Sequence, residues 1–367
     1  MKPKIFITPW IDLSNTEVQK CIDAGANSGR IHTGKANAEK IIDLIKFYDS
    51  IDFKFYLDLR GNKASVDFID SGNEFADAKI GDSLWIYENT KYYNLKSADI
   101  KLRFNYFPAS LSNMIDQKSD FALDDGNILL TVINKEFDES ECLTGLLCKV
   151  TRANSKKIWI GDGITSSNYF IHSNNKSVLT KIDIKILESI PQNIRDKVKY
   201  AAVSFCENQD QISDCVKTLQ NLGYNSAQVV PKIETAQGVK NIDEICLKLH
   251  KLYKGSAEVQ IGRSDLSLDS KRLSPPVNAD DLTDKAIKTC RENHVKISIL
   301  ALILQSVRKR HKLNQKSNNW KPSLSEYNYI KHLCKCGVYQ IGLTNDMYID
   351  RPELMINALS NTINMIG

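Results

Sequence analysis

The fold is decided by a stretch that reads KYAAVSFCENQDQISDCVKTLQNLGYNSAQVVPKI over residues 199–233. Short apolar runs at 199–205 and 227–233 have the composition of strands. Between them, residues 208–222 show the apolar spacing of an amphipathic helix. A strand, a helix and a second strand in this order are typical of α/β architecture.

The same alternation continues on both sides of this stretch. Further strands are predicted at 4–8, 28–32, 53–58, 257–262, 295–300 and 338–343, and further helices at 15–24, 37–48 and 181–190. Eight strands that alternate with helices predict an α/β fold of the TIM (β/α)8 barrel type.

Residues 66–175 interrupt this pattern with short apolar runs and little helical periodicity. Leu84–Tyr87, Asn127–Val132 and Lys157–Ile160 are such runs, separated by Gly, Asp and Asn turn signals. We therefore expect an all-β domain of residues 66–175, inserted after the third barrel strand. The barrel domain, which we expect to be catalytic, then comprises residues 1–65 and 176–367.

Composition narrows the classes of function. Apolar residues make up 42% of the 367-residue chain, which excludes a disordered protein. Lysine and arginine number 49 against 44 acidic residues, without a basic arm, so a nucleic-acid partner is not expected. Since no apolar run approaches the roughly 20 residues needed to cross a bilayer, we expect a cytoplasmic protein without a membrane partner.

Cysteine and histidine spacing gives no sign of a metal cluster. The nine cysteines are scattered apart from one Cys-x-Cys pair at Cys334 and Cys336, and the six histidines form no H-x-x-x-H pair. We therefore expect reduced, mostly packed thiols and no histidine-built metal site.

Polar residues cluster where the predicted strands end, which in a TIM barrel is the active-site face. They are Arg30, Asp58, Arg60, Ser204, Lys232, Glu234 and Asp265. Glu234 and Asp265 offer hard oxygen ligands suited to Mg²⁺ or Mn²⁺. Arg30 and Lys232 supply positive charge for a phosphoryl or carboxylate group.

The segments that carry these residues occur in the order and approximate spacing of a known family. They are Gly25–Gly34, Tyr56–Lys63, Leu123–Gly126, Leu179–Asp183, Val203–Phe205, Pro231–Val239 and Gly262–Leu266. Over its whole length the chain resembles the pyruvate kinase family. The resemblance implies a TIM barrel with a β-barrel lid inserted after strand 3. It also implies that the family's C-terminal effector domain is absent here.

The resemblance implies roles for individual residues. Glu234 and Asp265 would hold the divalent metal, while Lys232, Arg30 and Arg60 would form the catalytic set. The substrate, phosphoenolpyruvate or pyruvate, would contact Arg30, Lys232 and two further positions, Ser204 and the Ser264–Asp265 segment.

The resemblance also leads to expectations about potassium, nucleotide and oligomeric state. Lys63 stands where potassium-independent members have a lysine, and with Asp58 it would replace the potassium ion, so no potassium requirement is expected. A nucleotide would lie near Lys35 and Asp125. A homodimer is expected from the family's habit of pairing through the barrel.

Departures from the family leave three functions open. Ala301 replaces the threonine associated with protonating the enolate, and Ser65 replaces an arginine expected near the nucleotide. The first function is Mg²⁺-dependent phosphoryl transfer between phosphoenolpyruvate and a nucleotide, to the family's acceptor or to an altered one. The second is enolate chemistry on a 2-oxo acid, as an aldolase, lyase or decarboxylase, or phosphorylation of a non-nucleotide acceptor. The third is a non-catalytic paralogue that binds a metabolite.

Overall fold

The structure is a computed structural model, and its chain divides into two units. It describes residues 2–8, 14–34, 37–61, 65–73, 75–104, 120–123, 127–154, 156–160, 162–163, 177–271, 275–301, 303–313, 321–344 and 351–366. The first unit comprises Met1–Gly61, Lys176–Ser270 and Val277–Gly367, and the second comprises Asn62–Asn175 and Lys271–Pro276.

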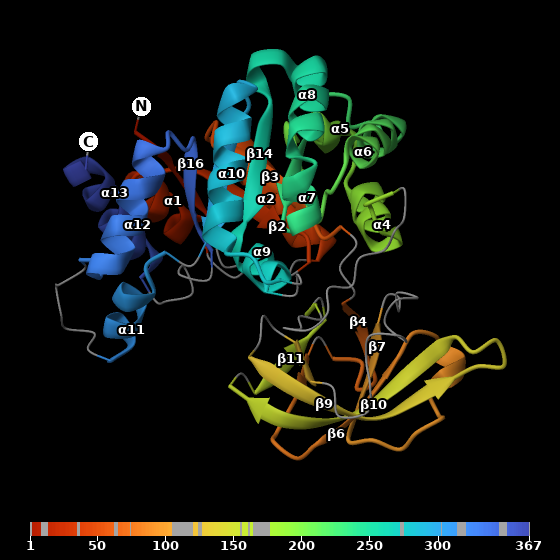
Figure 1. The fold of residues 1–367 in the computed structure, drawn as a ribbon. Helices are drawn as coiled ribbons and strands as arrows, with labels where there is room; N and C mark the ends of the chain where they lie inside the picture. Colours follow the sequence, from red (N-terminus) through yellow and green to blue (C-terminus); the bar gives the residue numbers. More distant parts are fainter. Residues whose placement is uncertain are drawn as a thin grey trace. The chain divides into compact units, whose positions relative to one another are not determined.

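The first unit is built on a closed barrel of eight parallel strands (Figure 1). The strands are β1 (Lys4–Ile7), β2 (Ala26–His32), β3 (Lys54–Leu59), β12 (Tyr200–Val203), β13 (Gln228–Ile233), β14 (Glu258–Gly262), β15 (Lys296–Ala301) and β16 (Gln340–Leu343). Each strand pairs with the next one along the chain, and β16 pairs with β1 to close the barrel. The TIM barrel expected from the sequence is confirmed.

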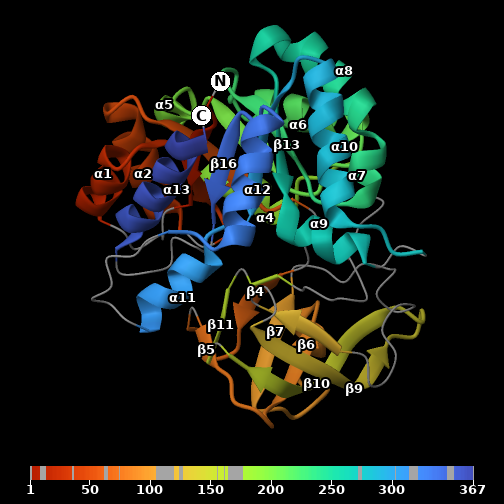
Figure 2. The same ribbon diagram turned by 60° about the vertical axis from the view of Figure 1, so that its left-hand side comes forward.

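Helices surround this barrel, as the two ribbon views show (Figures 1 and 2). They are α1 (Asn15–Asp23), α2 (Ala38–Ser50), α4 (Lys181–Ser189), α5 (Gln192–Arg195), α6 (Gln209–Asn221), α7 (Ala236–Lys240), α8 (Ile242–Tyr253), η3 (Lys254–Ser256), α9 (Arg263–Ser270), α10 (Ala279–Glu292), α11 (Gln305–Leu313), α12 (Leu324–Lys335) and α13 (Pro352–Ile366). Ser14, Thr180 and Ser323 begin α1, α4 and α12 with capping boxes, in which side chains satisfy amides that the first helical turn leaves unpaired.

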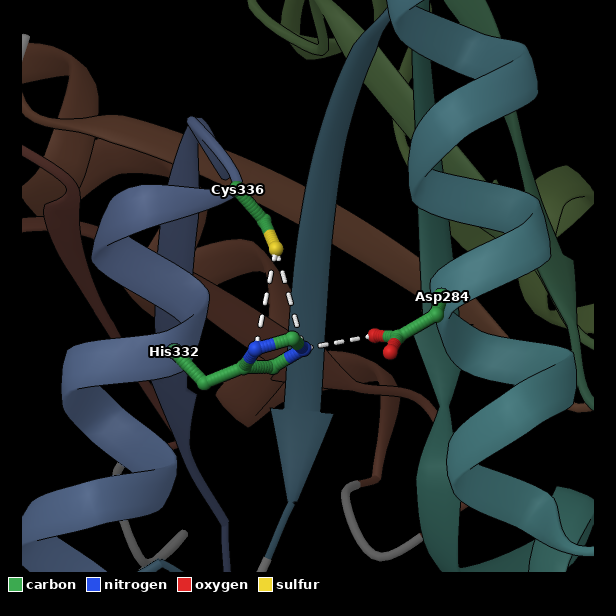
Figure 3. A group of neighbouring side chains, drawn as sticks. All are labelled: Asp284, His332 and Cys336. Atoms are coloured by element: carbon green, nitrogen blue, oxygen red, sulfur yellow. Dashed lines mark hydrogen bonds and ion pairs between the residues drawn. The ribbon is translucent and has the colours of Figure 1, made fainter.

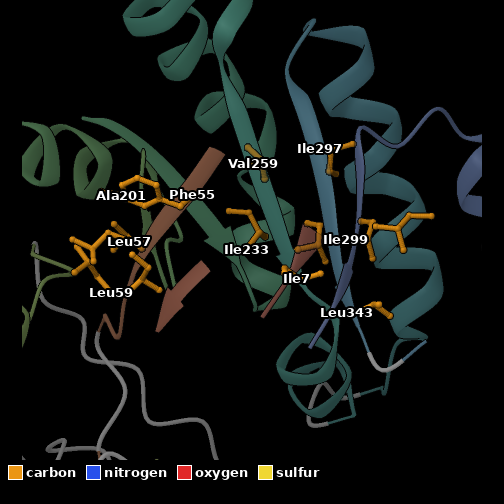
Figure 4. Close-up of a cluster of buried hydrophobic side chains, with 14 of the residues drawn as sticks. Ile7, Phe55, Leu57, Leu59, Ala201, Ile233, Val259, Ile297, Ile299 and Leu343 are labelled. Atoms are coloured by element: carbon orange, nitrogen blue, oxygen red, sulfur yellow. The ribbon is translucent and has the colours of Figure 1, made fainter. Parts of the chain in front are cut away.

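Side chains alternate between the two faces of each barrel strand. On β3 the outward residues Phe55, Leu57 and Leu59 join the large apolar cluster between strands and helices (Figure 4). The inward Tyr56 instead belongs to a small separate cluster inside the barrel, with Phe6, Ala202, Val230 and Leu300. The interior is therefore packed with side chains at mid-height.

A buried polar network lies where the strands begin. Glu258 on β14 accepts hydrogen bonds from the Tyr56 hydroxyl at 2.6 Å and the Ser298 hydroxyl at 2.9 Å, and it pairs with the Lys54 ammonium at 2.8 Å. Gln340 Oε1 accepts from the same Tyr56 and Ser298 hydroxyls. Four strands are thereby tied together at this end of the barrel.

The second unit is all-β in its described residues, apart from the short turn η1 (Thr90–Tyr92), which confirms the predicted class of the insert. Its strands are β4 (Val66–Ile69), β5 (Phe75–Asp77), β6 (Ser83–Tyr87), β7 (Ile100–Phe104), β8 (Asp120–Leu123), β9 (Ile128–Phe137), β10 (Leu143–Ala153) and β11 (Lys157–Trp159). Six of them form a sheet in the order β4-β7-β6-β10-β9-β8, and β11 pairs with β5. This unit has an apolar core of its own, which includes Leu84, Leu130 and Leu146.

A search of the described helices for a membrane-spanning segment finds none with the necessary length and hydropathy.

Replacing Glu258 with alanine is expected to lower the free energy of unfolding in urea by about 3 kcal/mol, because the partly buried Lys54 ammonium and the hydroxyls of Tyr56 and Ser298 lose an acceptor. Glu188, exposed on α4, is the matched control, and Glu188→Ala should change that free energy by less than about 0.5 kcal/mol. Equal losses in both variants would show that the network does not stabilise the barrel.

Candidate active site

Four inward side chains meet at the carboxyl ends of the adjacent strands β3, β12 and β13. Asp58 lies on β3, Ser204 follows β12, Lys232 lies on β13 and Glu234 follows it, and each is at most 6% exposed. Period-two alternation places Lys232 and Glu234 on the same face, with the outward Ile233 between them. The structure brings these four predicted site residues together.

Lys232 is the centre of the group. Its Nζ donates to the Ser204 hydroxyl at 2.8 Å and lies 3.2 Å from Glu234 Oε1 and 3.3 Å from Asp58 Oδ1. The other carboxylate oxygen of Asp58 pairs with Arg30 Nη1 at 2.9 Å. Two cations and two carboxylates thus form one continuous network inside the barrel, at the carboxyl ends of the strands.

The network favours the charged forms of Lys232 and Asp58. Burial alone lowers the pKa of Lys232, but the carboxylates of Asp58 and Glu234 outweigh it, so that the pKa lies above its ordinary value. Burial correspondingly raises the pKa of Asp58, while the charges of Lys232 and Arg30 outweigh it and hold that pKa below its ordinary value. An ammonium is therefore present in the interior at neutral pH.

Glu234 is held in place by its backbone surroundings. Its Oε2 accepts a hydrogen bond at 3.1 Å from the amide of Phe205, whose φ of 59° is unusual for a residue with a side chain. A Cβ at Gly262 would lie 2.3 Å from Glu234 Oε1, so only glycine leaves room for the carboxylate there. Gly61 is constrained in the same way, because a Cβ there would lie 2.2 Å from the Ser204 carbonyl oxygen.

Arg60, the first residue after β3, is fixed by two contacts. Its amide donates to Asp183 Oδ1 at 2.9 Å, and its Nη2 donates to the carbonyl of Gly34 at 3.0 Å. Asp183 is fully buried in the capping box of α4, and burial raises its pKa despite the hydrogen bonds it accepts from Thr180 and Arg60. These contacts of Arg60 position the loop after β3.

Asp265 and Ser264 lie in the first turn of α9, directly after β14. Asp265 is close enough for its charge to raise the pKa of Lys232, whereas the Ser264 side chain is exposed. The remaining predicted site residues, Lys63, Lys35 and Asp125, lie outside the described residues.

Sequence reasoning missed several positions that shape the site. Gly262 and Asp183 lie in segments that resemble the family but were not predicted as site residues. Gly262 leaves room for the Glu234 carboxylate, and Asp183 accepts a hydrogen bond from the Arg60 amide. At Ala301, which is buried, the backbone carbonyl accepts from the hydroxyl of Thr344 at 3.5 Å. Thr344 directly follows β16, so the strand-end rule could have pointed to it.

Comparisons with known proteins identify the family of the chain. Residues 7–293 match the family model described as the barrel domain of pyruvate kinase. The chain belongs to the pyruvate kinase family. The pyruvate kinase of Sporosarcina psychrophila is 27% identical over 198 residues, which is 51% of this chain and 32% of that protein. The pyruvate kinase of Methanocaldococcus jannaschii is 24% identical over 283 residues, covering 77% of this chain and 53% of its own.

Among solved structures, the chain resembles the crystal structure of pyruvate kinase from Pyrobaculum aerophilum. The TM-score is 0.67 at 19% identity, and the match covers all of this chain and 73% of the other. The likeness shows a shared fold. The matches span about a quarter to a half of the length of the curated pyruvate kinases.

Gly262→Ala is expected to lower the free energy of unfolding by about 1–3 kcal/mol, because the added methyl group overlaps a carboxylate that is held on both oxygens. Gly255→Ala is the matched control, since a Cβ there meets nothing within 4 Å. Urea titrations of both variants measure the difference. A Gly262→Ala protein as stable as the control would contradict the tight fit around Glu234.

Asp58→Asn is expected to destabilise the barrel in a pH-dependent way. Because the folded pKa of Asp58 lies below its ordinary value of 3.8, its ionisation stabilises the protein fully above pH 3.8 and loses this effect as the pH falls through the folded pKa. The variant should therefore be less stable by about 3 kcal/mol at pH 7, and the gap should narrow below pH 3.8.

Urea unfolding of the wild type and variant between pH 7 and pH 3 measures this gap. Asp23→Asn, at an exposed position in α1, should show almost no gap at any of these pH values. A gap for Asp58→Asn that stays constant or widens on acidification would contradict the ionic role of Asp58.

Proposed function

We propose that the chain is a phosphotransferase that moves a phosphoryl group between phosphoenolpyruvate and a nucleotide, in keeping with its family. One observation carries this proposal, namely the charged Lys232 held between Asp58 and Glu234 inside the barrel, beside Arg30. A buried ammonium is costly, and a barrel that had only to be stable would gain from an apolar residue there. Its charge suits a reaction in which negative charge develops.

The residues present fit a divalent cation of the Mg²⁺ or Mn²⁺ type. Glu234 and Asp265 follow neighbouring strands, and both offer hard oxygen ligands. Arg30, Asp58, Lys232, Glu234 and Asp265 together carry two positive and three negative formal charges. The space that Gly262 leaves for the Glu234 carboxylate is a further sign that this oxygen donor is needed in place. A bound Mg²⁺ would neutralise phosphoryl oxygens and orient the substrate.

The protein groups would act by charge and position. In the forward reaction the bond between phosphorus and the enol oxygen of phosphoenolpyruvate breaks, an oxygen of the nucleotide forms the new bond to phosphorus, and the enolate gains a proton to give pyruvate. Arg30 and Lys232 are the cations that would face the phosphoryl and enolate oxygens. Amides at the start of α9, around Ser264 and Asp265, are proposed to hold the carboxylate of the substrate.

We propose that potassium is not required. The carboxylate of Asp58, one of the two residues expected to replace the ion, already pairs with Arg30 and Lys232. The Asp58 carbonyl accepts from the Thr33 hydroxyl at 2.8 Å, and the Gly34 carbonyl accepts from Arg60.

A second function is favoured by the absence of a hydroxyl at Ala301. Enolate chemistry on a 2-oxo acid would use the same cations and carboxylates without a nucleotide. It would show as metal-dependent exchange of the methyl protons of pyruvate when no nucleotide is present.

The deciding experiment is a phosphorus NMR time course with phosphoenolpyruvate, Mg²⁺ and a mixture of nucleoside diphosphates, run with and without potassium. Phosphate that appears on a nucleotide at the same rate in both supports the proposal. Intact phosphoenolpyruvate together with proton exchange into pyruvate would replace it with the second function. Intact phosphoenolpyruvate without exchange would leave a metabolite-binding role.

Lys232→Met is expected to lower the turnover number by about 10²–10³, the usual cost of removing one group that stabilises transition-state charge. Glu234→Gln and Asp265→Asn should each abolish metal-dependent activity. Lys251→Met, at an exposed position of α8, is the control and should keep the wild-type rate. Full activity in both carboxylate variants would rule out the metal assignment.

A further inference from the structure

Three potential metal ligands meet outside the strands of the barrel, on helices that carry none of the candidate active-site residues. Asp284 lies on α10, His332 lies on α12 and Cys336 follows the last turn of α12. His332 Nε2 lies 2.7 Å from Asp284 Oδ1 and 3.6 Å from Cys336 Sγ. Figure 3 shows the three side chains pointing toward one another from the two helices.

The local structure sets up this arrangement. His332 and Cys336 are four residues apart, which places them on the same face of a helix. Cys336 keeps a helical backbone, with φ −69° and ψ −9°, although it is the C-cap. Arg291 on α10 donates to the carbonyl of Cys336 at 3.0 Å and so ties the end of α12 to α10.

We propose that Asp284, His332 and Cys336 bind a divalent transition-metal ion of the Zn²⁺ type. A group of this kind, with one sulfur, one imidazole nitrogen and one carboxylate oxygen, is the donor set that Zn²⁺ takes from proteins. All three donor atoms lie within 4.8 Å of one another.

The separations are close to those of a tetrahedral site. With bonds of about 2.3 Å to sulfur and about 2.0–2.1 Å to nitrogen and oxygen, tetrahedral ligand atoms lie about 3.4–3.6 Å apart. The observed 3.6 Å from nitrogen to sulfur already meets this value. The 2.7 Å from nitrogen to oxygen is a hydrogen-bond distance, and it needs to open by less than about 1 Å to admit the ion.

Three protein ligands leave one position for water or a small anion. An open cavity of about 390 Å³ adjoins the group and is lined by Asp284, Ile287, Lys288, Arg291, Glu292 and Cys336. The thiolate and the carboxylate would together neutralise a divalent ion, and the proton of the thiol would leave on binding. Since the ion would bridge α10 and α12, we expect its binding to stabilise the barrel.

The proposed site differs in chemistry from the oxygen ligands Glu234 and Asp265. Thiolate and imidazole select Zn²⁺ and Co²⁺ over Mg²⁺. A spectroscopic signal from sulfur therefore separates this site from the proposed Mg²⁺ site without any measurement of activity.

Cobalt binding tests the proposal directly. The probe is Co²⁺ added to the full chain after removal of any affinity tag and of bound metal by a chelator. We expect intense visible absorption of tetrahedral Co²⁺ together with a thiolate-to-cobalt band in the near ultraviolet, and displacement of both by one equivalent of Zn²⁺. Cys336→Ser should abolish the thiolate band, and His332→Ala and Asp284→Asn should weaken Co²⁺ affinity at least about tenfold.

Two other free thiols provide matched controls. Cys334→Ser, two residues from Cys336, and Cys142→Ser, at an exposed position of the second unit, should keep the wild-type spectrum. Zn²⁺ should raise the thermal unfolding midpoint of the wild type and of both controls, but not that of Cys336→Ser. A cobalt spectrum without a thiolate band, or a band that Cys336→Ser retains, would overturn the assignment.

Discussion

The Lys232 ammonium inside the barrel is the constraint on which the arrangement of side chains at the carboxyl ends of the barrel strands depends. A buried cation is tolerated only with close carboxylate partners, and Asp58 and Glu234 come from different strand ends. A slip of one residue in the register of β3 or β13 would turn these side chains to the outer face. Two further residues position the Glu234 carboxylate. Phe205, with its unusual φ, donates its amide to this carboxylate, and Gly262 leaves space for it.

An apolar layer separates this group from the second polar network of the barrel. Phe6, Tyr56, Ala202, Val230 and Leu300 fill the middle of the interior. At the amino ends of the strands, Glu258 accepts hydrogen bonds from groups on other strands, and we expect it to stabilise the barrel. The division matches the general rule for TIM barrels, in which chemistry lies at the carboxyl ends of the strands and stability at the amino ends.

Much of the fold and of the candidate site could be predicted from the sequence. The strand-end rule pointed to Arg30, Asp58, Lys232 and Glu234, and the structure joins these four by ion pairs. The contacts of Arg60 were not foreseen, since its amide pairs with Asp183, a residue 123 positions away. Thr344 was missed although it directly follows β16, where the strand-end rule applies, and its contact with the carbonyl of Ala301 depends on the pairing of β15 with β16.

By itself the sequence determined the alternation of strands and helices, the all-β insert and the position of Lys232 and Glu234 at the end of a strand, because these follow from short-range periodicity. Only the tertiary structure decided which side chains meet across separate elements. Asp284 lies 48 residues before His332, and nothing in that spacing predicts a contact. The two approach because α10 and α12 pack on the same barrel, and the relative placement of helices depends on the packing of the whole core.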